Sequence, residues 1–208
     1  MKITTALEQV VDAALHVVAP SYARERTEQP TYEVLVDDEP FELRRYAPQL
    51  VASVTVSGDR DEANDEAFGK LARYIFASDR EGEEIDMTTP VTQAVRGTDP
   101  MVTLAGVTSG QYTVRFTMPA RWTRETLPTP DDPNIMIGEL SERQMAVVTF
   151  SGRATDEAVR EQAEKLRGFM ERHSLLADGT LEYAYYDPPF TPPPGRRNEV
   201  MMGVIGQA

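Results

Sequence analysis

The chain contains no cysteine, which excludes disulfide bonds, thiolate catalysis and metal sites built on cysteine. It has only two histidines, His16 and His173, and these leave little for a zinc site or a histidine-based catalytic triad. The spacing patterns of phosphate-binding loops, dinucleotide-binding folds, calcium-binding loops and serine hydrolases are absent as well. We therefore expect a protein that is not an enzyme.

Long apolar runs are also missing, since no stretch approaches the ~18 residues of a transmembrane helix. Basic residues are few: 21 Lys and Arg stand against 34 Asp and Glu, which gives a formal net charge of −13. A surface of that sign repels the phosphates of nucleic acids and anionic lipids. We expect no nucleic-acid partner and no membrane span.

The first 30 residues differ from the rest of the chain. Apolar residues recur there at helical spacing until Pro20, and a polar linker follows over 21–30; the apolar positions are Ile3, Leu7, Val10, Val11, Ala14, Leu15 and Val18. Asp12 and His16 interrupt the apolar stretch, so we interpret it as a mature segment of a cytoplasmic protein and not as a signal peptide. Packing on the domain or a partner is the favoured role, because the polar face is acidic, with peripheral membrane contact through 3–19 as the alternative. We expect 1–30 to be an amphipathic helix and linker, and 31–208 to be one domain.

Alternating apolar residues predict strands through most of this domain, and two segments have helical periodicity. The helices are expected at Asp61–Ala77 and Asp156–His173, with His173 as a C-terminal capping residue. Arg121–Pro133 is expected to be a loop. The strands are expected at Tyr32–Val36, Phe41–Tyr46, Leu50–Ser57, Thr88–Val95, Met101–Val107, Gln111–Met118, Ile135–Leu140, Met145–Phe150, Leu181–Tyr186 and Glu199–Ile205.

The second half of the sequence echoes the first. Val54–Gly58 (Val-Thr-Val-Ser-Gly) resembles Val148–Gly152 (Val-Thr-Phe-Ser-Gly), and Lys70-Leu71 begins a helical pattern that recurs at Lys165-Leu166. A repeat of this length is too long for a solenoid. We interpret it as duplicated strand-strand-helix-strand half-domains of an α+β protein, with a cleft for a ligand between the halves.

Three segments resemble the SOUL haem-binding family, in the same order and with similar separations. They are Tyr32–Val34 with Phe41–Pro48, Phe68–Ile75 with Ile85–Val91, and Tyr186–Phe190 with Arg196–Val200. The resemblance extends over about residues 31 to 205. It implies a distorted antiparallel β-barrel flanked by two helices, which binds haem or a related tetrapyrrole non-covalently in an apolar surface cleft beside the first helix.

The resemblance also implies which residues contact the tetrapyrrole, although two positions depart from the family pattern. Arg45 stands where one branch of the family has a histidine proposed as an iron ligand, and Asp65 stands where another branch has an arginine. The axial ligand therefore stays open, with Met87, Tyr186, Met201 or no protein atom as the choices. The residues expected to bind the cofactor are Asn64, Phe68, Leu71, Ala72, Ile75, Met87, Tyr186, Phe190, Arg45 and Arg197.

The chemistry of a porphyrin accounts for these residue types. Aromatic and aliphatic side chains would cover the two faces of the ring, and the guanidinium of Arg45, Arg73, Arg196 or Arg197 would pair with its propionates. Leu71 and Ile75 could equally belong to the core, and Met87–Pro90 could be structural.

Three other functions remain open on the sequence. The chain could be an effector-type module for another amphipathic molecule, or an interaction protein that docks through its N-terminal helix. Glu83, Glu84 and Asp86 could suggest acid–base catalysis, but a run of this kind is more typical of a solvated loop. The sequence leaves open the oligomeric state and whether haem would be carried, buffered or sensed.

Overall fold

The computed structural model describes residues 27–96 and 110–207. The predicted N-terminal helix at 3–19 and the predicted strand Met101–Val107 lie outside the described residues. Within them, the chain forms nine strands and two long helices, so the α+β class predicted from the sequence is confirmed.

The strands follow the alternating segments of the sequence closely, because successive side chains of a strand point to opposite faces of the sheet. Their bounds are β1 Tyr32–Asp38, β2 Phe41–Tyr46, β3 Gln49–Gly58, β4 Val91–Arg96, β5 Gly110–Thr117, β6 Met136–Leu140, β7 Arg143–Ser151, β8 Leu175–Tyr185 and β9 Arg197–Gln207. A short 3₁₀ helix, η1, spans Pro193–Gly195. Two predicted strands differ at their starts: β4 begins after Pro90, and β8 begins at Leu175 and continues through a register irregularity before Leu181.

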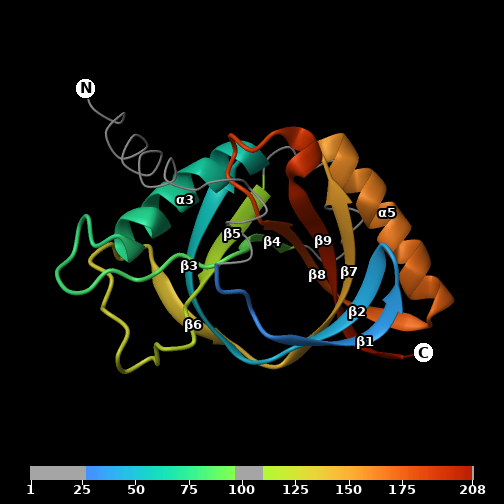
Figure 1. The fold of residues 1–208 in the computed structure, drawn as a ribbon, viewed down its shortest axis with the longest axis horizontal. Helices are drawn as coiled ribbons and strands as arrows, with labels where there is room; N and C mark the ends of the chain where they lie inside the picture. Colours follow the sequence, from blue (N-terminus) through green and yellow to red (C-terminus); the bar gives the residue numbers. More distant parts are fainter. Residues whose placement is uncertain (1–26, 97–109, 208) are drawn as a thin grey trace.

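All nine strands belong to one antiparallel sheet in the order β1-β2-β7-β9-β8-β4-β5-β3-β6. The sheet is strongly curved (Figure 1). However, its edge strands β1 and β6 do not pair with each other, so the sheet is not closed and the prediction of a distorted antiparallel β-barrel is wrong. Both edge strands have features that discourage pairing with another chain. β6 has only five residues, and β1 is irregular between Val34 and Val36.

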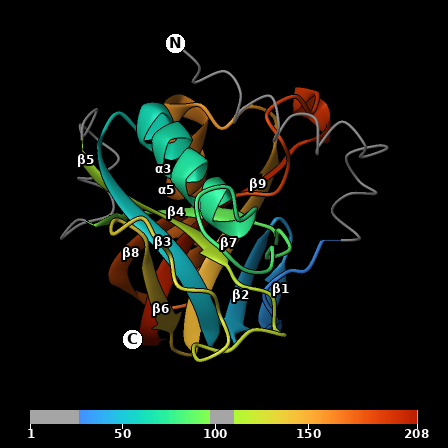
Figure 2. The same cartoon turned by 90° about the vertical axis from the view of Figure 1, so that its left-hand side faces the viewer.

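The helices α3 (Arg60–Ile75) and α5 (Asp156–Arg172) lie on the outer side of the curved sheet (Figures 1 and 2). α3 packs on β3 and β5, and α5 packs on β7, β8 and β9. Each helix follows a strand that ends in Ser-Gly, and the glycines there have positive φ, 145° at Gly58 and 106° at Gly152. Because glycine tolerates such angles, these residues let the chain turn sharply from strand to helix.

The ends of α5 show why the sequence predicted it well. The Thr155 hydroxyl accepts a hydrogen bond from the backbone N–H of Ala158, which satisfies one of the free donors at the start of the helix. His173 is the C-terminal capping residue, as predicted, and its backbone N–H donates to the Phe169 carbonyl.

The two halves have the same arrangement around the central β4–β8 pair. From that pair outward, one half of the sheet runs β4-β5-β3-β6 and the other runs β8-β9-β7-β2. In each half, the helix connects an inner strand to a central strand: α3 connects β3 to β4, and α5 connects β7 to β8. The strands that precede β3 and β7 are exchanged between the halves, since β2 pairs with β7 and β6 pairs with β3.

The sheet therefore has two faces of different chemistry. The face toward the helices carries the main core, with Leu71, Ile75, Leu166 and Phe169 almost completely buried against the strands. The opposite face, which neither α3 nor α5 covers and which we call the helix-free face, has a smaller apolar cluster that includes Tyr46, Met145, Val147, Tyr186 and Met201. Buried charged residues accompany this second cluster, and they form the candidate site.

Candidate functional site

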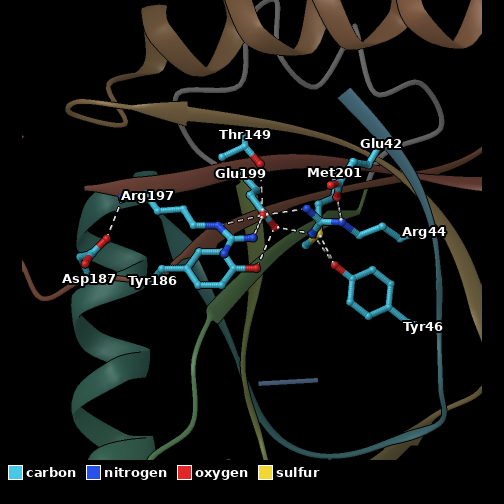
Figure 3. Close-up of polar contacts among 9 residues, drawn as sticks. All are labelled: Glu42, Arg44, Tyr46, Thr149, Tyr186, Asp187, Arg197, Glu199 and Met201. Atoms are coloured by element: carbon cyan, nitrogen blue, oxygen red, sulfur yellow. Dashed lines mark hydrogen bonds and ion pairs between the residues drawn. The ribbon is translucent and has the colours of Figure 1, made fainter. Parts of the chain in front are cut away.

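Arg44 and Glu199 form a buried ion pair on the helix-free face (Figure 3). Arg44 comes from β2 and Glu199 from β9, and each residue is only 1% exposed. The two side chains meet in a bidentate arrangement, with Nη1 and Nη2 of Arg44 each 3.1 Å from one carboxylate oxygen of Glu199. Arg44 also donates to the Tyr46 hydroxyl at 3.0 Å and pairs with Glu42. This pair connects two of the three segments that carry the family resemblance.

Glu199 accepts from several further donors. The Tyr186 hydroxyl donates to its Oε2 at 2.9 Å, Arg197 Nη2 donates to its Oε1 at 2.6 Å, and the Thr149 hydroxyl lies 3.3 Å from Oε1. We call the group Glu42, Arg44, Tyr46, Tyr186, Arg197 and Glu199 the Arg44 network. Because donors surround the Glu199 carboxylate, it has little capacity left to act as a general base.

Burial and the charges of the Arg44 network shift the pKa values of its ionisable side chains. Burial acts to raise the pKa of Glu199, but Arg44 and Arg197 hold it below its usual value of 4.5. Burial raises the pKa of Tyr46 to about 12 and that of Tyr186 well above 10. The tyrosines are therefore neutral hydrogen-bond donors at physiological pH, and Glu199 is ionised.

A second buried carboxylate, Glu182 on β8, lies on the same face. Arg115 Nη1 donates to it at 2.8 Å, and Arg143 donates through Nη1 at 2.7 Å and Nη2 at 3.2 Å. These two arginines hold the pKa of Glu182 below its usual value, although burial opposes the shift. The sequence alone did not single out either buried carboxylate. The signal that could have found them is a charged residue at a position of an alternating strand where an apolar residue is expected.

The lowered pKa values of Glu199 and Glu182 predict acid sensitivity. A carboxyl group whose pKa is lower in the folded state stabilises the fold fully above its unfolded value of 4.5, and this contribution is lost as pH falls through the folded pKa. We expect the urea concentration at the midpoint of unfolding to be constant near neutral pH. It should decrease when the pH is lowered below about 4.5. Glu182→Gln should have a shallower fall than the wild type. A midpoint that stays level down to pH 3 would contradict this account.

A narrow crevice lies beside the Arg44 network, lined by Tyr32, Tyr46, Thr92, Arg143, Tyr186 and Met201 among others. Its volume is about 10 Å³, whereas pockets for drug-sized ligands have roughly 300–1,000 Å³. Two ring faces are already covered, because the Arg44 guanidinium lies 4.4 Å from the Tyr32 centroid and that of Arg197 lies 4.1 Å from the Tyr186 centroid. A macrocycle therefore does not fit this crevice.

The candidate residues of α3 fall into two groups. Leu71 and Ile75 are buried in the main core, the alternative that the sequence left open for both, and Ala72 is buried as well. Asn64 and Phe68 are half-buried, one turn apart on the helix. The Phe68 ring packs edge-on against Phe116 at 5.3 Å, and Asn64 Oδ1 is buried without a hydrogen-bond partner among the described residues.

The remaining candidates are dispersed. Met87 is half-buried against the main core, in the segment before β4. Phe190 is 57% exposed in the loop between β8 and β9. Arg45 pairs with Glu33 at 2.9 Å at the exposed edge of the sheet. Tyr186 and Arg197 belong to the Arg44 network on the face opposite α3, so the structure does not bring all ten candidates to one site.

The described residues contain no group of three or more histidine, aspartate or glutamate side chains placed to hold a metal ion. His173 lies against the Phe169 ring, and its Nε2 is 3.9 Å from Asp38. It is therefore engaged at the end of α5. No helix in the described part of the chain is long and apolar enough to cross a membrane.

A shallow groove of about 210 Å³ lies near Trp122. Trp122 belongs to the loop expected at Arg121–Pro133, and the sequence indicated no role for it. Pro48, Leu50 and Trp122 form its apolar part, and Arg124 and Glu139 are also in its lining. Trp122 is the single tryptophan of the chain, which makes it a natural fluorescence probe.

Comparison with known proteins gives a family match over most of the chain. The family model described as "SOUL heme-binding protein" matches residues 27–203. Heme-binding protein 1 of Sus scrofa is 30% identical over 142 residues, which cover 68% of this chain and 71% of that protein. Heme-binding protein 1 of Mus musculus is 29% identical over 168 residues, covering 80% and 85%.

Solved structures share the fold at low sequence identity. The C-terminal domain of EcmrR superposes with a TM-score of 0.64 at 9% identity, covering 85% of this chain and 99% of that domain. A hydrolase from Listeria innocua has a TM-score of 0.56 at 14% identity, covering 82% and 94%. At these identities the likeness concerns the fold alone.

Proposed function

This chain belongs to the SOUL heme-binding protein family, and on that premise we propose that it binds haem or a related tetrapyrrole at the outer surface of α3 without catalysing a reaction. Membership implies tetrapyrrole binding. The family match over residues 27–203 is the observation that carries the proposal. Carriage, buffering and sensing are all compatible with such a role.

Two observations favour α3 over the helix-free face. The crevice on the helix-free face is far too small for a macrocycle, and guanidinium groups cover the ring faces of Tyr32 and Tyr186. On α3, the half-buried Phe68 ring packs against the main core and offers apolar area for stacking.

The polar atoms of this surface favour one kind of contact with the ligand. Asn64 lies one turn before Phe68 on α3, and its side-chain amide N–H₂ can donate to a haem propionate, which at neutral pH only accepts hydrogen bonds. No histidine or cysteine of the described chain lies on α3. We therefore propose binding dominated by stacking and apolar contact, with Asn64 as the polar contact and no histidine ligand from the described residues.

A haemin titration of the full chain tests the function. Soret absorbance and quenching of Trp122 fluorescence should both saturate at one haemin per chain. Phe68→Asp should weaken binding by about tenfold or more, because a charge replaces the apolar surface under the ring. Leu176→Asp, at an exposed position on β8, is the matched control and should bind like the wild type. Non-saturable absorbance changes, or equal binding by both variants, would contradict the proposal.

Replacing Asp65 by arginine should strengthen haemin binding. Asp65 is exposed on α3, one turn before Phe68, and burial together with the neighbouring Asp61 raises its pKa. Its charge opposes the propionates of haem, whereas arginine would attract them. We expect Asp65→Arg to lower the dissociation constant several-fold, with Asp65→Asn intermediate, in the same titration at low salt. An unchanged or weaker affinity of Asp65→Arg would place the propionates away from this part of α3.

A further inference from the structure

Arg143 has an unsatisfied donor on the helix-free face. It is the first residue of β7, where it pairs with Tyr46 of β2, and its side chain lines the crevice beside the Arg44 network. Its Nη1 and Nη2 donate to Glu182. Its Nε is buried and has no hydrogen-bond partner among the described residues. A guanidinium N–H left in this state is costly, because burial removes its water without replacing the acceptor.

The charge beside Nε favours an anion as the missing acceptor. Arg115 and Arg143 both pair with the single carboxylate of Glu182, so this triad carries one excess positive charge. The ion pairs of Arg44 and Arg197 with Glu42 and Glu199 balance each other and do not neutralise that excess.

The dimensions of the crevice limit what the acceptor can be. A volume of about 10 Å³ is roughly the room for one water molecule or one ion of similar size. Gln29 and Pro30 also line the crevice. They belong to a segment that is fixed in place, since Glu28 accepts hydrogen bonds from the backbone N–H groups of Thr89 and Ala120. A carboxylate on a larger molecule would have to displace this segment.

We propose that the crevice binds one small inorganic anion of the size of chloride, held by the Nε–H of Arg143. The anion accepts the free hydrogen bond and balances the charge of the Glu182 triad. Thr92, which also lines the crevice, adds a neutral hydroxyl donor. This site is independent of tetrapyrrole binding, because it lies on the opposite face of the sheet from α3.

Chloride-35 NMR of the full chain tests this site. At constant ionic strength, with gluconate as the larger replacement anion, wild-type protein should broaden the chloride signal saturably. Arg143→Lys keeps the charge but loses the Nε–H, and should reduce that broadening about tenfold, the usual effect of a lost charge-assisted hydrogen bond. Arg167→Lys, at an exposed position on α5, is the matched control and should broaden the signal like the wild type.

Bromide locates the anion without any variant, so the test stands even if Arg143→Lys fails to fold. Crystals of the wild type grown with bromide should give an anomalous peak beside Arg143 Nε. Saturable broadening together with that peak supports the site. A crevice occupied by water, shown by no saturable broadening and no peak, overturns it. A peak without saturable broadening, or a peak elsewhere, also overturns it, because the anion is then adventitious.

Discussion

Arg44→Met is expected to lower the free energy of unfolding by about 3–5 kcal/mol, the usual cost of removing one partner from a buried ion pair. Arg44 and Glu199 are both 1% exposed, and they meet through two 3.1 Å contacts. Without Arg44, Glu199 stays buried with Arg197 and Tyr186, while Tyr46 and Glu42 lose a partner. The measurement is urea unfolding. A lower urea concentration at the midpoint, with an unchanged dependence of the free energy on urea, gives the loss of stability.

The neighbouring residue provides a matched control on the same strand. Arg45 pairs with Glu33, but the two side chains are 40% and 65% exposed. Surface pairs of this kind contribute about 0–1 kcal/mol, so Arg45→Met should change stability by no more than that. Equal losses for Arg44→Met and Arg45→Met would show that burial does not explain the contribution of the Arg44 network to stability.

A double variant separates the pair from its surroundings. If the loss in Arg44→Met comes from an uncompensated Glu199 charge, then Glu199→Met added to Arg44→Met should recover part of the lost stability. If the Arg44 network acts as one cooperative unit, the double variant should instead be less stable than either single variant.

Phe169→Ala should cost about 3–5 kcal/mol, as is typical when a large buried aromatic is truncated and leaves a cavity. The Phe169 ring is fully buried on α5, stacked on Phe41 at 5.3 Å and in contact with His173 at 4.5 Å. The cavity would lie between α5 and Phe41 of β2. The same urea measurement gives the loss.

Phe190→Ala is the control for this variant. Phe190 is exposed in the loop before η1, and surface substitutions usually change stability by less than about 0.5 kcal/mol. A loss for Phe169→Ala below about 1 kcal/mol would mean that α5 repacks around the missing ring and that the core is softer than the structure indicates.

These two sites differ in how far the sequence predicted them. Phe169 falls on the apolar stripe of the helix expected at Asp156–His173, and the sequence alone indicates that such a stripe is buried. Arg44 and Glu199 were visible only as members of short motifs, 155 positions apart. No local pattern says that two charged residues that far apart will meet in a bidentate pair.

The candidate ligand site shows the same division. The sequence predicted the helix now called α3 to within two residues at each end, and it placed Asn64 and Phe68 on it. It grouped Tyr186 and Arg197 with them, but those two residues lie across the sheet from the helix. Motif residues that occur together in a family can serve the fold from one face of the sheet and a ligand from the other.

By itself, the sequence determined the α+β class, both described helices, most strand positions and the family. These depend on periodicity, on capping residues such as Thr155 and on the Ser-Gly turns, all of which act over a few neighbouring positions. The tertiary structure alone decided that the sheet stays open, that β2 and β6 exchange halves, and that Glu199 and Glu182 each lie between two arginines. Those features depend on contacts between distant strands, whose register and curvature are fixed only when the whole sheet packs against α3 and α5.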